Sequence, residues 1–123
     1  MEFRLFTVAE IIILHDAVLN AGELEGLAKD MSIEGALSRV EFRVNYQMIT
    51  DEYELAAMYA VAISQAHAFR DANKRTAHAA MKLTLKMHGI QLPLPTKEVG
   101  DIIIKTAQGQ LDEVELAAWL RTQ

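Results

Sequence analysis

One stretch of this chain is apolar on nearly every side of the helix that it predicts. Residues 55–66 read Leu-Ala-Ala-Met-Tyr-Ala-Val-Ala-Ile-Ser-Gln-Ala, and the preceding Asp51-Glu52-Tyr53-Glu54 is a capping signature. A surface helix has a single apolar stripe, whereas a helix that is apolar all round is buried by its neighbours. This helix therefore belongs at the centre of a bundle, and the rest of the chain must supply the helices that surround it.

The remaining segments carry the signals of such helices. The capping box Thr7-Val8-Ala9-Glu10 starts a helix that we expect to reach about Ala21 and to stop at Gly22. Trp119 is the expected core anchor of the last helix. Further helices are predicted over residues 32–46, 73–88, 96–107 and 112–120, and residues 90–95 are expected to form an extended connector or one edge strand. We therefore predict an all-α, single-domain helical bundle of about six helices over residues 1–123.

The composition limits the classes of protein that the chain can belong to. It has 123 residues, 51% of them hydrophobic, which is enough for one folded core and argues against disorder. The net charge of −5 disfavours a general nucleic-acid binder, and no apolar run approaches the ~18 residues of a membrane span. There is no cysteine and no signal-peptide pattern. We expect a cytoplasmic protein with neither a nucleic-acid nor a membrane partner.

Chemistry is concentrated in the turn after the central helix, His67-Ala68-Phe69-Arg70-Asp71-Ala72-Asn73-Lys74-Arg75-Thr76. Unperturbed histidine side chains exchange a proton near neutral pH, which makes His67 a candidate general base for a hydroxyl group. Asp71 is either a ligand for Mg²⁺ or the ordinary N-cap of the next helix. Asn73 either holds the turn together or binds a phosphate.

The first turn of the next helix contains two cations, Lys74 and Arg75. Positive charge is unfavourable at a helix N-terminus until an anion binds there. The same N-terminus offers unpaired N–H groups, which also attract anions. The segment therefore predicts a phosphate site beside a general base.

Other histidines leave alternatives open. His15-Asp16 on the first helix would suit a metal-dependent phosphohydrolase, although that class needs further ligands, and His15 is otherwise a partly buried structural residue. His78 either faces the phosphate site or packs elsewhere on its helix. The acidic loop over residues 22–31 is either a solvated connection or a surface that seats a protein target.

The motif His67-x-Phe69-x-Asp71-x-Asn73-Lys74-Arg75-Thr76 resembles the signature of the Fic/Doc family, and specifically of its Doc (death-on-curing) toxin branch. The likeness covers roughly residues 8–120. It includes Leu14-His15-Asp16, the loop Gly22-Glu23-Leu24-Glu25-Gly26-Leu27, the segment Ala36-Leu37-Ser38-Arg39 and the closing Gly89.

The resemblance implies a nucleotide-dependent transferase. Fic enzymes generally move AMP from ATP to a hydroxyl group, and their pattern differs from this chain at Ala68, Ala72, Lys74 and His78. The lysine is a Doc trait, and the Doc branch transfers the γ-phosphate of ATP to a threonine of elongation factor Tu, which arrests translation. Ala72 keeps the turn tight provided that its φ is negative.

Site roles carried over from the family fall on five residues. His67, Asp71 and Arg75 would be catalytic, with His67 as the base. Asn73, Lys74 and Arg75 would bind the phosphates of ATP, and Asp71 would hold Mg²⁺. The alternatives are a protein adenylyltransferase and a catalytically silent protein that only binds an antitoxin.

The resemblance also implies a partner that restrains the enzyme. Self-restrained Fic proteins carry Ser/Thr-x-x-x-Glu-Gly/Asn, but Ala21 precedes Glu25-Gly26 and Asp30 precedes Glu34-Gly35. We therefore expect inhibition in trans by a Phd-type antitoxin, whose disordered C-terminal segment folds on the toxin.

Overall fold

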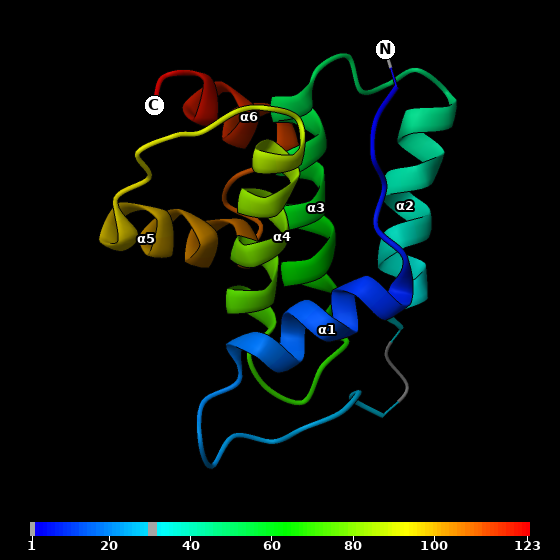
Figure 1. Cartoon of the computed structure of the whole chain (residues 1–123), viewed down its shortest axis with the longest axis vertical. Coiled ribbons are helices and arrows are strands. Elements are labelled where there is room, and N and C mark those ends of the chain that lie inside the picture. Colours follow the sequence, from blue (N-terminus) through cyan, green and yellow to red (C-terminus); the bar gives the residue numbers. More distant parts are fainter. Residues whose placement is uncertain (1, 30–31) are drawn as a thin grey trace.

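The computed structural model describes residues 2–29 and 32–123, and over those residues the chain forms six α-helices and no strand. In chain order these are α1 (Val8–Val18), α2 (Ile33–Asn45), α3 (Glu52–Ala66), α4 (Asn73–Met87), α5 (Thr96–Ala107) and α6 (Glu113–Arg121). Figure 1 shows α3 and α4 side by side at the centre, α2 and α5 on opposite sides of them, and α1 across one end. The all-α prediction is confirmed, and residues 90–95 form a connector without strand structure.

Helix α3 is the centre of the bundle, as its all-round apolar sequence predicts. Every residue from position 55 to position 64 is buried, and the helix packs against α2, α4, α5 and α6. One apolar cluster joins α3 to α1, α2, α4 and the N-terminal segment, and a second joins it to α4, α5 and α6. Both clusters include residues of α3 and of α4. No helix of the described residues has the length and hydropathy needed to cross a bilayer.

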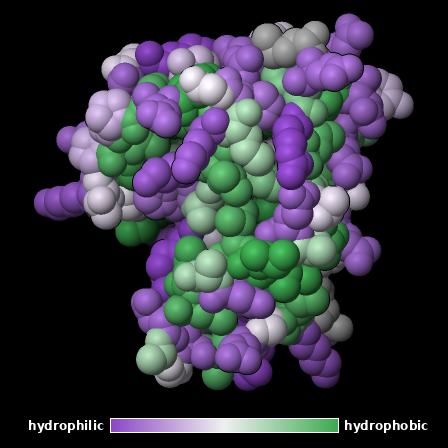
Figure 2. Space-filling view, viewed as in Figure 1, coloured by the Kyte–Doolittle hydropathy of each residue, from purple (hydrophilic) through white to green (hydrophobic). Residues whose placement is uncertain are grey.

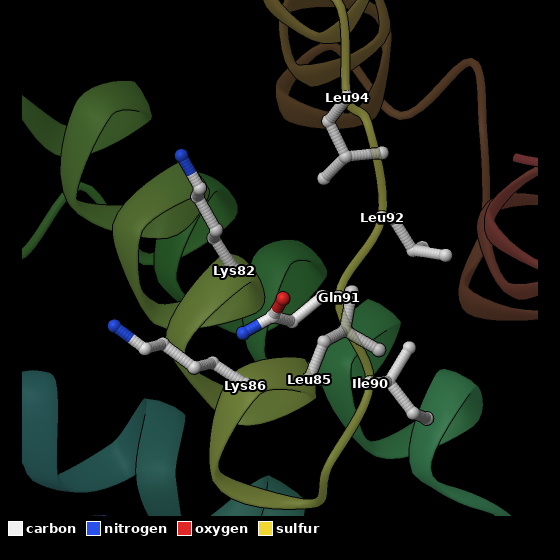
Figure 3. A pocket seen from close by; sticks show the side chains of 7 residues that line it. All are labelled: Lys82, Leu85, Lys86, Ile90, Gln91, Leu92 and Leu94. Carbon is white, nitrogen blue, oxygen red and sulfur yellow. The ribbon is translucent and has the colours of Figure 1, made fainter.

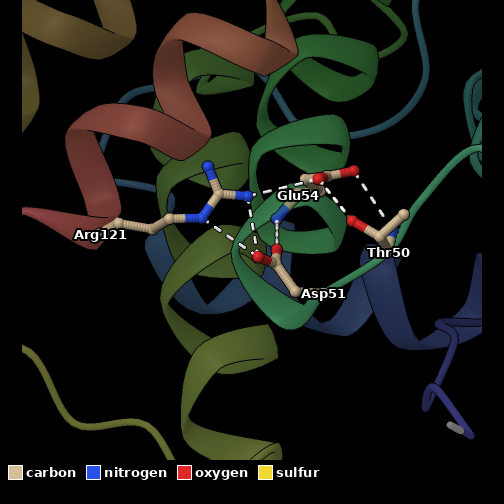
Figure 4. A network of polar contacts seen from close by, with 4 residues as sticks. All are labelled: Thr50, Asp51, Glu54 and Arg121. Carbon is tan, nitrogen blue, oxygen red and sulfur yellow. Dashed lines mark hydrogen bonds and ion pairs between the residues drawn. The ribbon is translucent and has the colours of Figure 1, made fainter.

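The predicted N-caps of α1 and α3 form as the sequence indicates, and Ser32 and Asp112 cap α2 and α6. At α3, the Asp51 carboxylate accepts the Glu54 N–H at 2.8 Å. Arg121 from the end of α6 donates to Asp51 at 2.8 Å and to Glu54 at 3.3 Å (Figure 4). The start of the central helix is thereby fixed to the end of the chain.

Two details of the predicted helices are wrong. Helix α1 ends at Val18 rather than near Ala21, because the backbone turns extended at Leu19 and the Val18 carbonyl accepts a hydrogen bond from Arg75 at 2.6 Å. Gly22, with φ +86°, lies in the separate turn that follows. Trp119 is only partly buried, because α6 turns the face of Leu116, Ala117 and Leu120 into the core instead.

Candidate active site

A tight corner joins α3 to α4, and two non-glycine residues in the left-handed region bend it. His67 ends α3 with φ +50° and ψ +39°, and Ala72 precedes α4 with φ +65° and ψ +26°. Between them Ala68 and Phe69 are buried, so the corner is pinned into the core. The condition that the sequence analysis placed on Ala72, a negative φ, is not met. A left-handed alanine is strained, and such strain persists only where surrounding contacts fix the backbone.

The corner opens on a pocket of about 300 Å³ that contains all five predicted site residues. His67 and Lys74 are exposed, whereas Asp71, Asn73 and Arg75 are half-buried. The complete lining is Glu23, Ser64, His67, Arg70, Asp71, Ala72, Asn73, Lys74 and Arg75. A histidine, two carboxylates and three cations therefore converge on one concave surface.

The side chain of Asn73 holds the corner together. Its Oδ1 accepts the Phe69 N–H at 3.0 Å, and its Nδ2 donates to the Phe69 carbonyl at 2.8 Å. Both ends of the amide are thus bound to one residue of the turn. The sequence leaves two roles open for Asn73, holding the turn together or binding a phosphate. In the structure its side chain holds the turn, and only its backbone N–H remains for an anion.

Asp71 is not the N-cap of α4, contrary to one of its two predicted roles. Ala72 occupies the cap position, and α4 has no side-chain cap. The Asp71 Oδ2 atom instead accepts the Leu24 N–H at 2.9 Å, which ties the corner to the loop after α1. Its Oδ1 atom has no hydrogen bond to the described residues, so one carboxylate oxygen is left toward the pocket.

Arg75 is held by two groups from the α1 end of the molecule. It donates to the Val18 carbonyl at 2.6 Å and pairs with the Glu23 carboxylate. The hydrogen bond from Arg75 lowers the pKa of Glu23, and the same contact raises the pKa of Arg75. The guanidinium is thereby fixed in direction, with its side chain 39% exposed at the edge of the pocket.

The N-terminus of α4 is electrostatically unlike those of the other helices. The other five each have an acidic residue in the first turn, and four of them have a side-chain cap as well. Helix α4 has neither, and its first turn contains Lys74 and Arg75. Over the described residues, the backbone N–H groups of residues 72–75 have no hydrogen-bond partner. This arrangement favours an anion at the helix N-terminus.

The loop after α1 lies against the motif as a short antiparallel pairing. The Ala28 N–H donates to the Ala68 carbonyl at 2.8 Å, and the Arg70 N–H donates to the Gly26 carbonyl at 3.1 Å, on either side of an isolated bridge between Leu27 and Phe69. This part of the loop is therefore attached to the site rather than free in solvent. Leu27 is nevertheless 49% exposed, beside the pocket-lining Arg70.

The remaining histidines do not assemble a metal centre. His15 is buried, and its two ring nitrogens lie at hydrogen-bonding distance from Asp16 and from the Asp71 carbonyl. No group of three or more potential ligands comes together within residues 2–29 and 32–123. His78 lies between α4 and α5 beside Ile103 and Ile104, outside the pocket lining, and burial lowers its pKa.

A second pocket of about 280 Å³ lies near the other end of α4, beside the connector to α5 (Figure 3). Four of its lining residues are aliphatic, and its polar groups are two lysines and a glutamine. The lining is Lys82, Leu85, Lys86, Ile90, Gln91, Leu92 and Leu94. It contains no histidine or carboxylate, so it lacks a proton acceptor of the kind that the corner has.

Arg70, Glu23 and Ser64 line the pocket but have no role in the sequence prediction. Glu23 pairs with Arg75 across 52 positions, and Ser64 lines the pocket from the buried part of α3. Glu23 stands in a run with Glu25, so its sequence resembles a solvated loop, and Ser64 stands in an apolar helix. The tertiary fold brings Glu23 to the motif, whereas Ser64 lies one helical turn before His67 on α3.

Comparisons with known proteins agree with this geometry. The family model described as "Fic/DOC family" matches residues 5–85, which include the whole motif. The chain is also 38% identical over 113 residues to the protein named "Protein kinase doc" of Escherichia phage P1, which covers 91% of this chain and 89% of that protein. The resemblance inferred from the motif is thereby confirmed. With the corner, the uncapped helix and the histidine in place, the chain belongs to the Fic/Doc family of transferases.

Proposed function

We propose that this enzyme is a Doc-like protein kinase that transfers the γ-phosphoryl group of ATP to a threonine or serine hydroxyl of a protein. The observation that carries the proposal is one pocket in which exposed His67 lies beside the uncapped, cationic N-terminus of α4. It is supported by the 38% sequence identity to the phage kinase, in an alignment that covers 91% of this chain. Elongation factor Tu is the target that we propose to test first.

In this proposal each side chain has one task. The imidazole of His67 accepts the proton of the target hydroxyl as its oxygen bonds to the γ-phosphorus. The bond between the γ-phosphorus and its bridging oxygen breaks, and ADP leaves. Lys74, Arg75 and the N–H groups at the start of α4 bind the phosphate oxygens and stabilise their charge. The Asn73 side chain holds the corner that presents those N–H groups, and the backbone N–H of Asn73 is one of them.

The carboxylate of Asp71 fits a magnesium ion that is shared with a nucleotide. Mg²⁺ is usually held by one or two carboxylates together with phosphate oxygens and water, rather than by a complete protein cage. Asp71 offers one oxygen, Oδ1, while the Leu24 N–H fixes the other. When bound, the ion would neutralise charge on the phosphates.

We further propose that the enzyme acts as a cytoplasmic toxin and is restrained by a Phd-type antitoxin. An apolar pocket of about 230 Å³ lies between α1 and α4, lined by Arg4, Phe6, Glu10, Ile13, Leu14, Leu83 and Met87. Ile13 is 67% exposed there, and Figure 2 shows apolar side chains gathered over this part of the molecule. An amphipathic antitoxin segment that folds on binding would cover such a surface. The exposed Leu24 and Leu27 beside the site would contact the target protein.

Intact-mass spectrometry of elongation factor Tu, incubated with this protein and Mg-ATP, tests the proposal. We expect a gain of one phosphate, and a rate about 100- to 10,000-fold lower for His67→Ala, because a general base contributes about that much. His67→Asn is the matched variant, since asparagine tolerates a positive φ and also lacks the imidazole. An AMP-sized gain would show that the enzyme is an adenylyltransferase and not a kinase. No gain on this target would redirect the search to other proteins, with ATP hydrolysis and autophosphorylation as first readouts.

A further inference from the structure

The buried histidine of α1 reaches the motif from 56 residues away. His15 is 1% exposed, and its Nε2 atom lies 2.9 Å from the carbonyl oxygen of Asp71. Its ring is stacked on that of Phe69, with centroids 3.9 Å apart and planes 7° from parallel. Because a carbonyl oxygen only accepts, Nε2 is the donor in this hydrogen bond. His15 therefore contacts the corner twice, at the backbone carbonyl of Asp71 and at the buried ring of Phe69.

We propose that His15 is a positioning residue, which fixes the peptide between Asp71 and Ala72 so that the Ala72 N–H faces the phosphate site. The inference rests on the proposed function, in that the anion placed there is the phosphate chain of ATP. It assigns His15 neither a contact with substrate nor a bond to metal. Its role is to hold the backbone whose Ala72 N–H faces the phosphate site.

The peptide geometry gives the direction of this effect. In a trans peptide the C=O and N–H point to opposite sides, and the chain has no cis peptide bond over the described residues. Since His15 holds the Asp71 carbonyl on the core side, the Ala72 N–H points away from the core. Ala72 lines the pocket, and within residues 2–29 and 32–123 its N–H has no hydrogen-bond partner. It thus extends the row of free N–H groups at positions 73–75.

The corner needs such a restraint because the backbone of Ala72 would otherwise relax from its left-handed conformation to an unstrained one. An alanine held at φ +65° is strained relative to a right-handed one. Asn73 fixes the corner at Phe69, two residues before Asp71, while His15 fixes the carbonyl of Asp71 itself. Helix α1 is a firm base for this contact, because the Thr7 capping box starts it and fully buried Ile11 lies one turn before His15. The exposed Asp16 carboxylate lies 3.1 Å from Nδ1, and it accepts a hydrogen bond from that nitrogen only when Nδ1 also carries a proton.

Two substitutions separate the hydrogen bond from the packing. His15→Phe keeps an aromatic ring against Phe69 but removes the donor to Asp71. His15→Gln keeps an amide donor near the position of Nε2 but removes the ring. Ile11→Ala is the matched control, since it truncates a buried residue of the same helix, which destabilises the fold, and leaves the contact between His15 and Asp71 intact. All variants are compared at a temperature where each is folded.

The first readout is amide hydrogen exchange at positions 71–75 without nucleotide, and the second is Mg-ATP affinity by calorimetry. We expect His15→Phe to speed exchange at these positions and to weaken Mg-ATP binding about tenfold or more, with His15→Gln closer to the parent in both. Unchanged exchange and affinity in His15→Phe, or equal losses in Ile11→Ala, would overturn the inference. If the parent binds no Mg-ATP, the proposed function fails, and exchange alone then decides whether His15 positions the corner.

Discussion

Helices α3 and α4 pack against each other, but their N-termini are built in opposite ways. Helix α3 begins with Asp51 as its cap, has Glu52 and Glu54 in its first turn, and has Arg121 bridging Asp51 and Glu54 (Figure 4). Helix α4 begins after a strained alanine with no cap and no acid. Of its two cations, Arg75 is paired with Glu23, while Lys74 forms no ion pair with the described residues.

The difference separates a stabilising helix terminus from a binding one. At α3 the orphan N–H groups and the helix dipole are satisfied within the chain, so the terminus contributes to folding. At α4 the N–H groups and Lys74 are left for a ligand, so the terminus costs stability until an anion arrives. Substitutions at the two termini should therefore change different quantities, free energy of unfolding at α3 and nucleotide affinity at α4.

The largest effect is expected from charge reversal at the start of α4. Lys74→Glu replaces attraction for the phosphates by repulsion, which at about 4 Å is worth ~1–4 kcal/mol per unit charge. We expect Mg-ATP affinity, measured by calorimetry, to fall about 100-fold or more. The same change should raise the free energy of unfolding by about 0.3–1 kcal/mol, since an acid is favourable at a helix N-terminus.

Lys82→Glu is the matched control for that prediction. It makes the same change of charge on the same helix, eight residues further along, or about 12 Å by helical rise. Lys82 is exposed and lines the second pocket rather than the corner. An equal loss of affinity in both variants would indicate a general effect of net charge and would contradict the contrast between the two termini.

The next effect is loss of stability at the start of α3. Asp51→Ala removes a cap worth about 1 kcal/mol and a partly exposed ion pair worth up to about 1 kcal/mol. We expect urea denaturation to give a loss of about 2 kcal/mol, with Mg-ATP affinity unchanged. Asp112→Ala removes a cap without an arginine partner at α6 and should cost about 1 kcal/mol. A drop in affinity for Asp51→Ala would show that its terminus also serves the site.

These termini also mark how far the sequence alone predicts this molecule. The caps at Thr7, Asp51 and Asp112 depend on residues three positions apart, so a local pattern is sufficient to identify them. The five site residues are predictable for a similar reason, because they lie within nine consecutive positions. The buried face of α6 is less predictable, since an aromatic residue at Trp119 does not decide which side of the helix meets the core.

The backbone of the corner is set by contacts that no local pattern contains. Asp71 has the residue type of an N-cap, but the cap position falls on Ala72, whose left-handed conformation is supported by Asn73 and by His15 on another helix. The Glu23 partner of Arg75 is likewise 52 positions away. Sequence therefore identifies the chemistry of the site, whereas its shape depends on the packing of α1 against the corner.

A smaller effect is expected at the strained alanine. Ala72→Gly relieves roughly 1–2 kcal/mol of left-handed strain but adds about 0.4–1 kcal/mol of unfolded-chain entropy. We expect a net gain near 0.5 kcal/mol in the free energy of unfolding, seen as a slightly higher thermal midpoint. Activity should stay within about tenfold of the parent, since the corner keeps its contacts. A loss of stability would mean that the surrounding contacts do not impose the positive φ.

The smallest effect is expected in the pH dependence of stability from the Glu23–Arg75 ion pair. This pair lies at the start of α4, as Asp51–Arg121 lies at the start of α3. Arg75 lowers the pKa of Glu23 in the folded protein below its ordinary value of 4.5. The unfolded chain therefore binds the proton first as pH falls, so the stabilisation is present above about pH 4.5 and is lost through the folded pKa. Glu23→Gln removes the titrating group but keeps the shape of the side chain.

Thermal midpoints measured between about pH 7 and pH 3 should consequently fall more steeply for the parent than for Glu23→Gln, with the two curves converging at the acid end. The pKa of Glu10 is also lowered, mainly by a backbone hydrogen bond at Thr7, but Glu10 is present in both proteins. The difference between the curves therefore isolates Glu23. Parallel curves would show that the pair contributes no net stability, and that Arg75 is held in place mainly by the carbonyl of Val18.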